Sequence, residues 1–164
     1  MIAVSNTTPL RYLLAIGHGP LFPKLFEKVF VPSAVLEELT SSGAPEDVRR
    51  QILAAPPWLE VRAIRATDPN LSIFALHPGE REAILLTEEL WPDVLLIDER
   101  AGRTLASQRN LPLSGTLGVL ERADTLGLLV NFDKVLDDLV LEGFFISGPL
   151  KETLLQRYQL RRGS

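Results

Sequence analysis

The sequence predicts an α/β protein in which βαβ units build a mostly parallel sheet. Short apolar runs of strand length alternate along the chain with longer stretches of helical periodicity. Parallel neighbours need crossover connections, which are usually helices, so this alternation favours a parallel sheet. The chain has 164 residues, of which 46% are hydrophobic and 23% charged. That is one domain's worth of ordinary globular composition, and we predict a single domain over residues 1–164.

The predicted strands are apolar runs bounded by Gly, Pro or polar residues. They span Ile2 to Ser5, Lys28 to Val31, Leu59 to Ile64, Val94 to Asp98 and Leu111 to Leu113. A further short run, "FFIS" at residues 144–147, is predicted as an edge strand.

The segments between the strands place apolar residues at helical spacing. For the first of them, Thr8 can cap a helix, and Pro9 suits the first helical position, where a missing N–H costs nothing. The expected helices are Pro9 to Ile16, a short turn at Leu21 to Phe26, Ser33 to Thr40, Pro45 to Ala54, Pro78 to Leu90, Glu99 to Asn110, Thr116 to Leu126, Phe132 to Glu142 and Pro149 to Arg162.

The amino-acid composition excludes several kinds of functional site. The chain has no cysteine and only two histidines, His18 and His77, which excludes disulfides and thiolate sites and disfavours zinc. Any metal must therefore be bound by oxygen. The sequence has neither G-x-G-x-x-G nor a Walker lysine, so dinucleotide and P-loop sites are excluded. A net charge of -4 means that a nucleic acid would need a local basic patch.

The segment "MIAV" leads directly into a predicted strand, and no apolar run is long enough to span a bilayer. We therefore expect a cytoplasmic protein with no membrane partner.

Polar residues end two of the predicted strands. Asn6 follows Ile2 to Ser5, and Asp98 ends "VLLID". Ligands of parallel α/β sheets bind at the carboxyl ends of the strands, so these two side chains are expected to share one pocket if their strands are neighbours. The structural alternative for Asp98 is a helix N-cap before Glu99.

Further candidates lie on helices. In "VPSAVLEEL", Glu37 points away from the apolar side while Glu38 borders it, so Glu38 can reach a buried site. In "HPGEREAILL", Glu80 and Glu82 both fall early in a helix, where the dipole favours acids whatever their role, and periodicity does not choose between them. Thr116 follows Gly115 at a helix start, where N–H groups can receive a phosphate or simply be capped.

Six segments together resemble a known family: "VSNTTPL", "LFEKVFVPSAVLEEL", "LHPGEREAILL", "LLIDERAGRTLA", "LPLSGTLGVLERA" and "LEGFFIS". Their order and spacing are similar to those of the PIN-domain nucleases, in particular a branch of short, toxin-like bacterial and archaeal proteins. The resemblance implies a three-layer α/β/α sandwich around a mostly parallel sheet of about five strands. It also implies acids that bind Mg²⁺ or Mn²⁺, cleavage of single-stranded or structured RNA, and pairing with a cognate antitoxin protein.

The resemblance assigns the site position by position. Asn6 stands where the family has its first aspartate, Glu38 matches the helix glutamate and Asp98 the strand-end aspartate, while Glu82 matches the third acid with Glu80 as its rival. These acids would repel one another unless a divalent cation neutralised them. The residues expected to contact substrate are the hydroxyls Thr7, Thr8 and Thr116 and the cations Arg100 and Arg103, which lie one helical turn apart.

Asn6 departs from the family pattern because an amide keeps one oxygen ligand but removes a negative charge. Three interpretations follow: a weakened but active nuclease, an inactive fold that binds RNA or a protein partner, or a sequence altered to remove toxicity. The acidic net charge suits a partner with a basic segment, which supports the second interpretation. A phospho-acceptor domain is a weaker alternative, since no lysine ends a later strand.

Two apolar stretches, "PLRYLLAIG" and "FPKLFEKVF", hold more Leu, Phe and Tyr than one small sheet needs to cover it. We therefore expect a homodimer, and family members commonly pair through their early helices.

Overall fold

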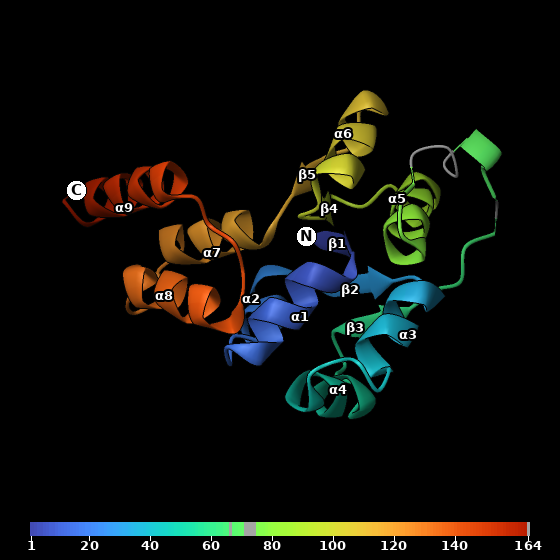
Figure 1. Cartoon of the computed structure of the whole chain (residues 1–164), viewed down its shortest axis with the longest axis horizontal. Helices are drawn as coiled ribbons and strands as arrows, with labels where there is room; N and C mark the ends of the chain where they lie inside the picture. Colours follow the sequence, from blue (N-terminus) through green and yellow to red (C-terminus); the bar gives the residue numbers. More distant parts are fainter. Residues whose placement is uncertain (66, 71–74, 164) are drawn as a thin grey trace.

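A computed structural model describes residues 1–65, 67–70 and 75–163, and Figure 1 shows a sheet with helices on both faces. The sheet has five strands in the described residues, in the order β3 (Leu59–Val61), β2 (Lys28–Val31), β1 (Ile2–Ser5), β4 (Val94–Leu96) and β5 (Leu113–Ser114). All neighbouring strands are parallel. This architecture confirms the predicted α/β fold class and its parallel sheet.

The helices follow the predicted order with small changes at their ends. They are α1 (Thr7–Ala15), α2 (Leu21–Leu25), α3 (Ser33–Thr40), α4 (Glu46–Leu53), α5 (Pro78–Leu90), α6 (Arg100–Gln108), α7 (Thr116–Thr125), α8 (Phe132–Glu142) and α9 (Gly148–Arg162). Helix α1 begins at Thr7 rather than at Pro9, with Asn6 as its N-cap residue. Pro9 is tolerated as the third helical residue because first-turn N–H groups have no intrahelical partner. The predicted capping role of Thr8 is therefore wrong.

The predicted "FFIS" strand is also wrong. Residues 144–147 link α8 to α9 and belong to neither a strand nor a helix. The Phe144 N–H donates to the Leu139 carbonyl at 3.0 Å, and its ring meets Tyr12 edge-on at 5.2 Å between centroids. Side-chain packing against α1 thus takes the place of a ladder of backbone hydrogen bonds.

The last strand is displaced from its predicted position. The expected strand at Leu111 to Leu113 is replaced by pairing at Leu113–Ser114, with Leu96 opposite Ser114. Leu111 closes the end of α6 instead, because its N–H donates to the Ala106 carbonyl at 3.0 Å.

The two faces of the sheet bury separate cores because strand residues alternate in direction. Ala3 points to the larger core, to which α1, α2, α3, α4, α7 and α8 contribute buried residues, whereas Val4 points to a smaller core under α5 and α6. The stretches from which we expected a homodimer lie in the larger core: Leu10, Leu13, Leu14, Phe22 and Leu25 are all buried. The basis of that expectation is therefore wrong.

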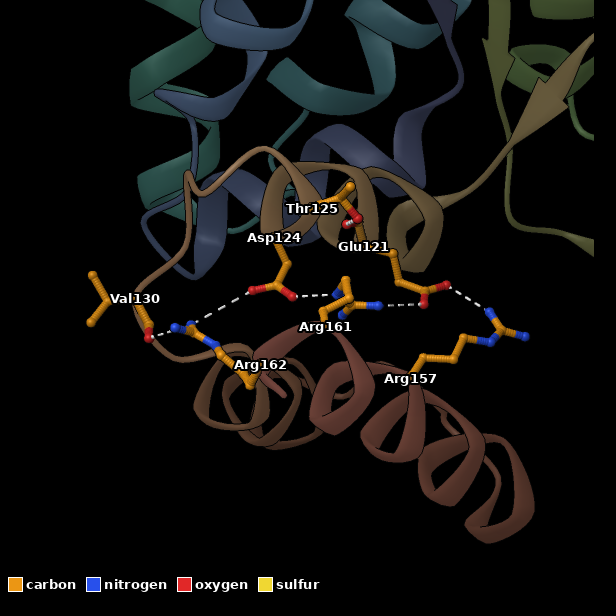
Figure 2. Close-up of polar contacts among 7 residues, drawn as sticks. All are labelled: Glu121, Asp124, Thr125, Val130, Arg157, Arg161 and Arg162. Carbon is orange, nitrogen blue, oxygen red and sulfur yellow. Dashed lines mark hydrogen bonds and ion pairs between the residues drawn. The ribbon is translucent and has the colours of Figure 1, made fainter. Parts of the chain in front are cut away.

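Helix α9 is attached by ion pairs as well as by apolar contacts, with Leu155 and Tyr158 packed against the larger core. It buries only Leu154 among its described residues. Figure 2 shows its arginines facing Glu121 and Asp124 of α7. Arg161 Nε donates to Asp124 Oδ2 at 2.6 Å, and Arg157 Nη1 donates to Glu121 Oε1 at 2.9 Å. In the described residues, no helix is long and apolar enough to cross a membrane.

Candidate acid site at the carboxyl edge of the sheet

Asn6 stands at the centre of the sheet's carboxyl edge. Its strand, β1, pairs with β2 on one side and β4 on the other, so the two halves of the sheet diverge here. Ligands of open α/β sheets bind at such a switch point. The Asn6 side chain is 2% exposed, and its backbone N–H donates to the Leu96 carbonyl at 2.9 Å. The register of β1 and β4 thus places Asn6 beside the residues that follow β4.

Glu99 is the carboxylate that meets Asn6. Asn6 Nδ2 donates to Glu99 Oε2 at 2.9 Å, and the Thr8 hydroxyl donates to Glu99 Oε1. Asn6 Oδ1 is buried and has no hydrogen-bond partner in the described part of the chain. Sequence reasoning missed Glu99 because we interpreted it as a helix start. The signal was the acidic pair at positions 98 and 99, either of which can turn toward β1.

Glu38 reaches the same edge from α3. The Thr7 hydroxyl donates to Glu38 Oε2. Glu37 is exposed while Glu38 is half-buried, as the helical spacing predicted. The start of α5 packs directly on this carboxylate, since a Cβ added at Gly79 would lie 2.7 Å from Glu38 Oε1. Glycine at position 79 therefore leaves the space that the Glu38 carboxylate occupies.

Glu80 and Glu82, which periodicity could not separate, have different surroundings. Glu82 Oε1 accepts a hydrogen bond from the Ala34 N–H at 3.2 Å, at the first turn of α3. Glu80 is 5% exposed, and its Oε2 has no hydrogen-bond partner among the described residues. A Cβ added at Gly102 would lie 2.9 Å from that oxygen, so α6 approaches Glu80 closely. Glu82 thus binds a helix terminus, while Glu80 lies in the buried site.

Asp98 turns toward β5 rather than toward Asn6. Its Oδ1 accepts from the Thr116 N–H at 2.9 Å, and its Oδ2 accepts from the Thr116 hydroxyl at 2.6 Å. The N-cap of α6 is Glu99, so Asp98 caps α7 and not the helix that follows it. A Cβ added at Gly115 would lie 2.5 Å from Asp98 Oδ1 and 3.1 Å from Arg103 Nη1. Asp98, Thr116 and Arg103 therefore form a tight group beside the cluster of Asn6, Glu38, Glu80 and Glu99.

Burial and neighbouring charge act together on this cluster. Burial raises the pKa of Glu80, and the charges of Glu99 and Glu38 raise it further. Burial also raises the pKa of Asp98, against the opposing effect of its hydrogen bonds from Thr116. Raised carboxylate pKa values indicate negative charge without enough compensation, which is the situation that a bound cation relieves.

The donor atoms suit an oxygen-loving cation. Asn6 Oδ1 and Glu80 Oε2 are buried oxygens without partners, and Glu38 and Glu99 add carboxylates close to Glu80. Within the described ranges, no three acidic or imidazole side chains already converge to hold a metal ion. Mg²⁺ usually keeps several waters and takes only one or two carboxylates in addition to substrate phosphates. The residues present therefore fit Mg²⁺ or Mn²⁺, but not a cation that needs a fully protein-made shell.

The expected basic residues flank Asp98. Arg103 Nη1 donates to the Ile97 carbonyl at 2.8 Å, so this guanidinium is held against the strand end. Arg100, at the first position of α6, is exposed. The positive charge that a negatively charged substrate would need is thus local, as the overall charge of -4 requires.

Comparison with known proteins agrees with this architecture. A family model described as a PIN domain matches residues 2–159. No curated protein matches the chain. Among solved structures, a PilT N-terminus domain protein from the hyperthermophilic archaeon Sulfolobus solfataricus P2 is similar, with a TM-score of 0.54 and 18% identity, over 75% of this chain and 93% of its own. At that identity, the likeness concerns the fold alone.

Proposed function

The chain belongs to the PIN-domain family, and from this premise we propose that it is a divalent-metal-dependent ribonuclease. Family membership supports a PIN-type nuclease. The observation that supports metal dependence is the pair of buried, unpartnered oxygens of Asn6 and Glu80 at the carboxyl edge. Unpaired buried oxygens are costly, and a ligand that satisfies both is their simplest explanation.

We propose that Asn6, Glu80 and Glu99 would hold the metal, with Glu38 next to them. This set replaces Glu82 of the sequence-based assignment by Glu80 and adds Glu99, for the reasons of burial and contact given above. A bound Mg²⁺ or Mn²⁺ would polarise a phosphodiester oxygen and lower the pKa of a bound water. Asp98, which the family resemblance placed among the metal-binding acids, has a positioning role in this proposal, because its oxygens already accept from Thr116.

The chain's other polar residues orient this set. The Thr7 hydroxyl donates to Glu38 Oε2, and the two Glu99 oxygens accept hydrogen bonds from the Thr8 hydroxyl and from Asn6 Nδ2, so both carboxylates are held in place. Arg100 and Arg103 would bind substrate phosphates beside Asp98. Asn6 contributes a neutral oxygen where an aspartate would contribute a charge, so we expect weaker metal affinity than a four-carboxylate site would have.

RNA cleavage with Mn²⁺ tests this proposal. We expect native protein to cleave mixed RNAs, and Glu80→Gln and Glu99→Gln to lose most of that activity. Glu37→Gln is the matched control, because Glu37 is exposed on the helix that carries Glu38. Glu82→Gln separates the two rival acids: activity lost in Glu82→Gln and kept in Glu80→Gln would reverse our choice. Absence of metal-dependent cleavage from both the native protein and Asn6→Asp would refute the nuclease.

A catalytically silent binding module is the second candidate. It is favoured by the Asn6 amide, which donates a hydrogen bond to the Glu99 carboxylate and so stabilises it without a metal. Calorimetric titration with Mn²⁺ separates the two candidates. Millimolar or tighter binding that disappears in Glu80→Gln supports the nuclease, whereas no binding supports the silent module.

We further propose that the protein is the toxin of a toxin–antitoxin pair, acts in the cytoplasm, binds a cognate antitoxin protein and forms a homodimer. These partners are suggested by the family resemblance. Expression in a bacterial host should arrest growth, and Glu80→Gln should relieve the arrest. Growth arrest by both proteins alike would separate toxicity from the proposed site.

A further inference from the structure

A surface groove of about 450 Å³ adjoins the acid site on the side of β5. Its lining includes Asp98, Arg103 and Gly115 as well as Phe145 and Leu150. A second groove of about 720 Å³ continues past Asp98 and Arg103 along α6 to Arg100 and Ser107. Both grooves are lined by Asp98, Arg103 and Leu113, so they lie next to each other, and we call the two together the β5 channel.

Phe145 projects from the channel wall into solvent, and it is 84% exposed. Its neighbours hold it there. Phe144 packs on Tyr12, and Ile146 packs against the larger core. Both neighbours are thus partly buried, while Phe145 between them stays exposed. An exposed aromatic ring adds little to folding stability, and Phe145 lines the same groove as Arg103, so its ring is available to stack with a ligand.

The charge of the β5 channel favours a polyanion. Among its lining residues in the described chain, Arg100 and Arg103 are the cations and Asp98 is the acid. Both Asp98 oxygens already accept hydrogen bonds from Thr116, and the two guanidinium groups outnumber this single carboxylate. Guanidinium groups bind phosphates well because their donors match phosphate oxygens in pairs.

We infer that the β5 channel binds single-stranded RNA, with an unpaired base stacked on Phe145 and the adjoining phosphates on Arg103 and Arg100. This inference deepens the proposed ribonuclease function and rests on it. Stacking on an aromatic ring requires a free base face, which single strands offer and which a duplex keeps inside its own stack. Phe145 therefore selects for unpaired RNA without reading its sequence.

Binding of a fluorescent single-stranded RNA, measured by anisotropy in chelator, tests the inference without catalysis. Phe145→Ala should weaken binding by about 5- to 150-fold, the range found when a base-stacking aromatic is replaced. Phe145→Trp should bind as native does, while Phe145→Leu should bind as weakly as Phe145→Ala. Leu141→Ala is the matched control, because Leu141 is 86% exposed nearby and lines neither groove.

Duplex RNA of the same length and the melting temperature supply independent readouts. Phe145→Ala should leave the affinity for duplex RNA and the melting temperature unchanged. If the ring had only a structural role, the substitution would change the melting temperature. If the native protein cleaves RNA and Phe145→Ala binds single-stranded RNA as tightly as native does, the inference is overturned and the ribonuclease proposal stands. Binding that depends on Phe145, without any Mn²⁺-dependent cleavage, would overturn the ribonuclease and leave the RNA-binding inference intact. No binding of RNA by the native protein in either form would overturn both.

Discussion

Asn6 Nδ2 and Glu99 Oε2 lie 2.9 Å apart, so the amide donates to a carboxylate that an aspartate at position 6 would repel. Without metal, Asn6→Asp replaces a hydrogen bond to a charged group by like-charge contact. We expect the free energy of unfolding to fall by about 1.5–3 kcal/mol in chelator. With Mn²⁺ the sign should reverse, because a ligand that binds only the folded state stabilises it by mass action.

Thermal melts in chelator and in Mn²⁺ measure this reversal. Asn131→Asp is the control, since Asn131 caps α8 far along the chain and aspartate caps equally well. Melting temperatures of Asn6→Asp that equal the native values in both conditions would show that position 6 does not face the acids as described.

The raised pKa of Glu80 predicts how stability depends on pH. From the ordinary value of 4.5 up to the raised value, the folded chain holds a proton at Glu80 that the unfolded chain has released. The free energy of unfolding attributable to Glu80 therefore falls as pH rises through this window, and the loss persists above it.

Glu80→Gln should abolish this fall in the free energy of unfolding, because glutamine does not titrate. In chelator at neutral pH, the variant should melt above native, because glutamine carries no charge that burial penalises. At pH 4 the difference should disappear, and Glu37→Gln should follow the native curve throughout. A Glu80→Gln variant that melts below native at neutral pH would contradict an uncompensated charge at this position.

The approach of α6 to α5 depends on Gly102. A Cβ at this position would lie 2.5 Å from Ile97 Cδ1 and 2.9 Å from Glu80 Oε2. Because Ile97 is completely buried, it has no room to yield. Gly102→Ala should lower the free energy of unfolding by about 1–3 kcal/mol, despite alanine's higher helix propensity, and should also reduce cleavage by displacing Glu80.

Urea unfolding and the cleavage assay check these two effects together. Gly148→Ala is the matched control, since a Cβ there would meet nothing within 4 Å. We expect that variant to equal the native protein or exceed it slightly. Equal stability of both alanine variants would show that α6 can move away from the acid site at little cost.

At the scale of the whole molecule, α9 depends on the ion pair between Asp124 and Arg161. The Asp124 side chain is 2% exposed and that of Arg161 22%, so the pair is largely shielded from water (Figure 2). Asp124→Asn should cost about 1.5–3 kcal/mol, because Arg161 loses the charge-assisted hydrogen bond to Asp124 while its contact with Glu121 remains. Asp137→Asn breaks the more exposed contact with Lys151, also between α9 and the helices beneath it, and should cost less than about 1 kcal/mol.

Hydrogen exchange of α9 amides, with urea unfolding, measures both variants. Faster exchange confined to α9 in Asp124→Asn would show local release of the helix. Equal effects of the two substitutions would mean that apolar contacts, rather than the buried ion pair, attach α9.

The sequence by itself determined the order and type of the elements. Apolar runs of strand length and amphipathic periodicities are local properties, so the alternation that predicts a parallel sheet is readable without any contact. The placement of Asn6 at a strand end is equally local. The strand predicted at residues 144–147 was wrong because tertiary packing outweighed local propensity. This segment has a strand-like composition, but Phe144 and Ile146 pack against α1 and the larger core instead of joining a ladder of backbone hydrogen bonds.

Only the tertiary structure decided which acids meet. Glu80 and Glu82 are equivalent in sequence, since both begin the same helix, and their difference comes from α6 and α3 packing on opposite sides of it. Asp98 and Glu99 are adjacent, yet one turns to Thr116 on α7 and the other to Asn6 after β1. A side chain's partner depends on which distant backbone the sheet brings beside it, and strand order is a property of the whole chain rather than of any local pattern.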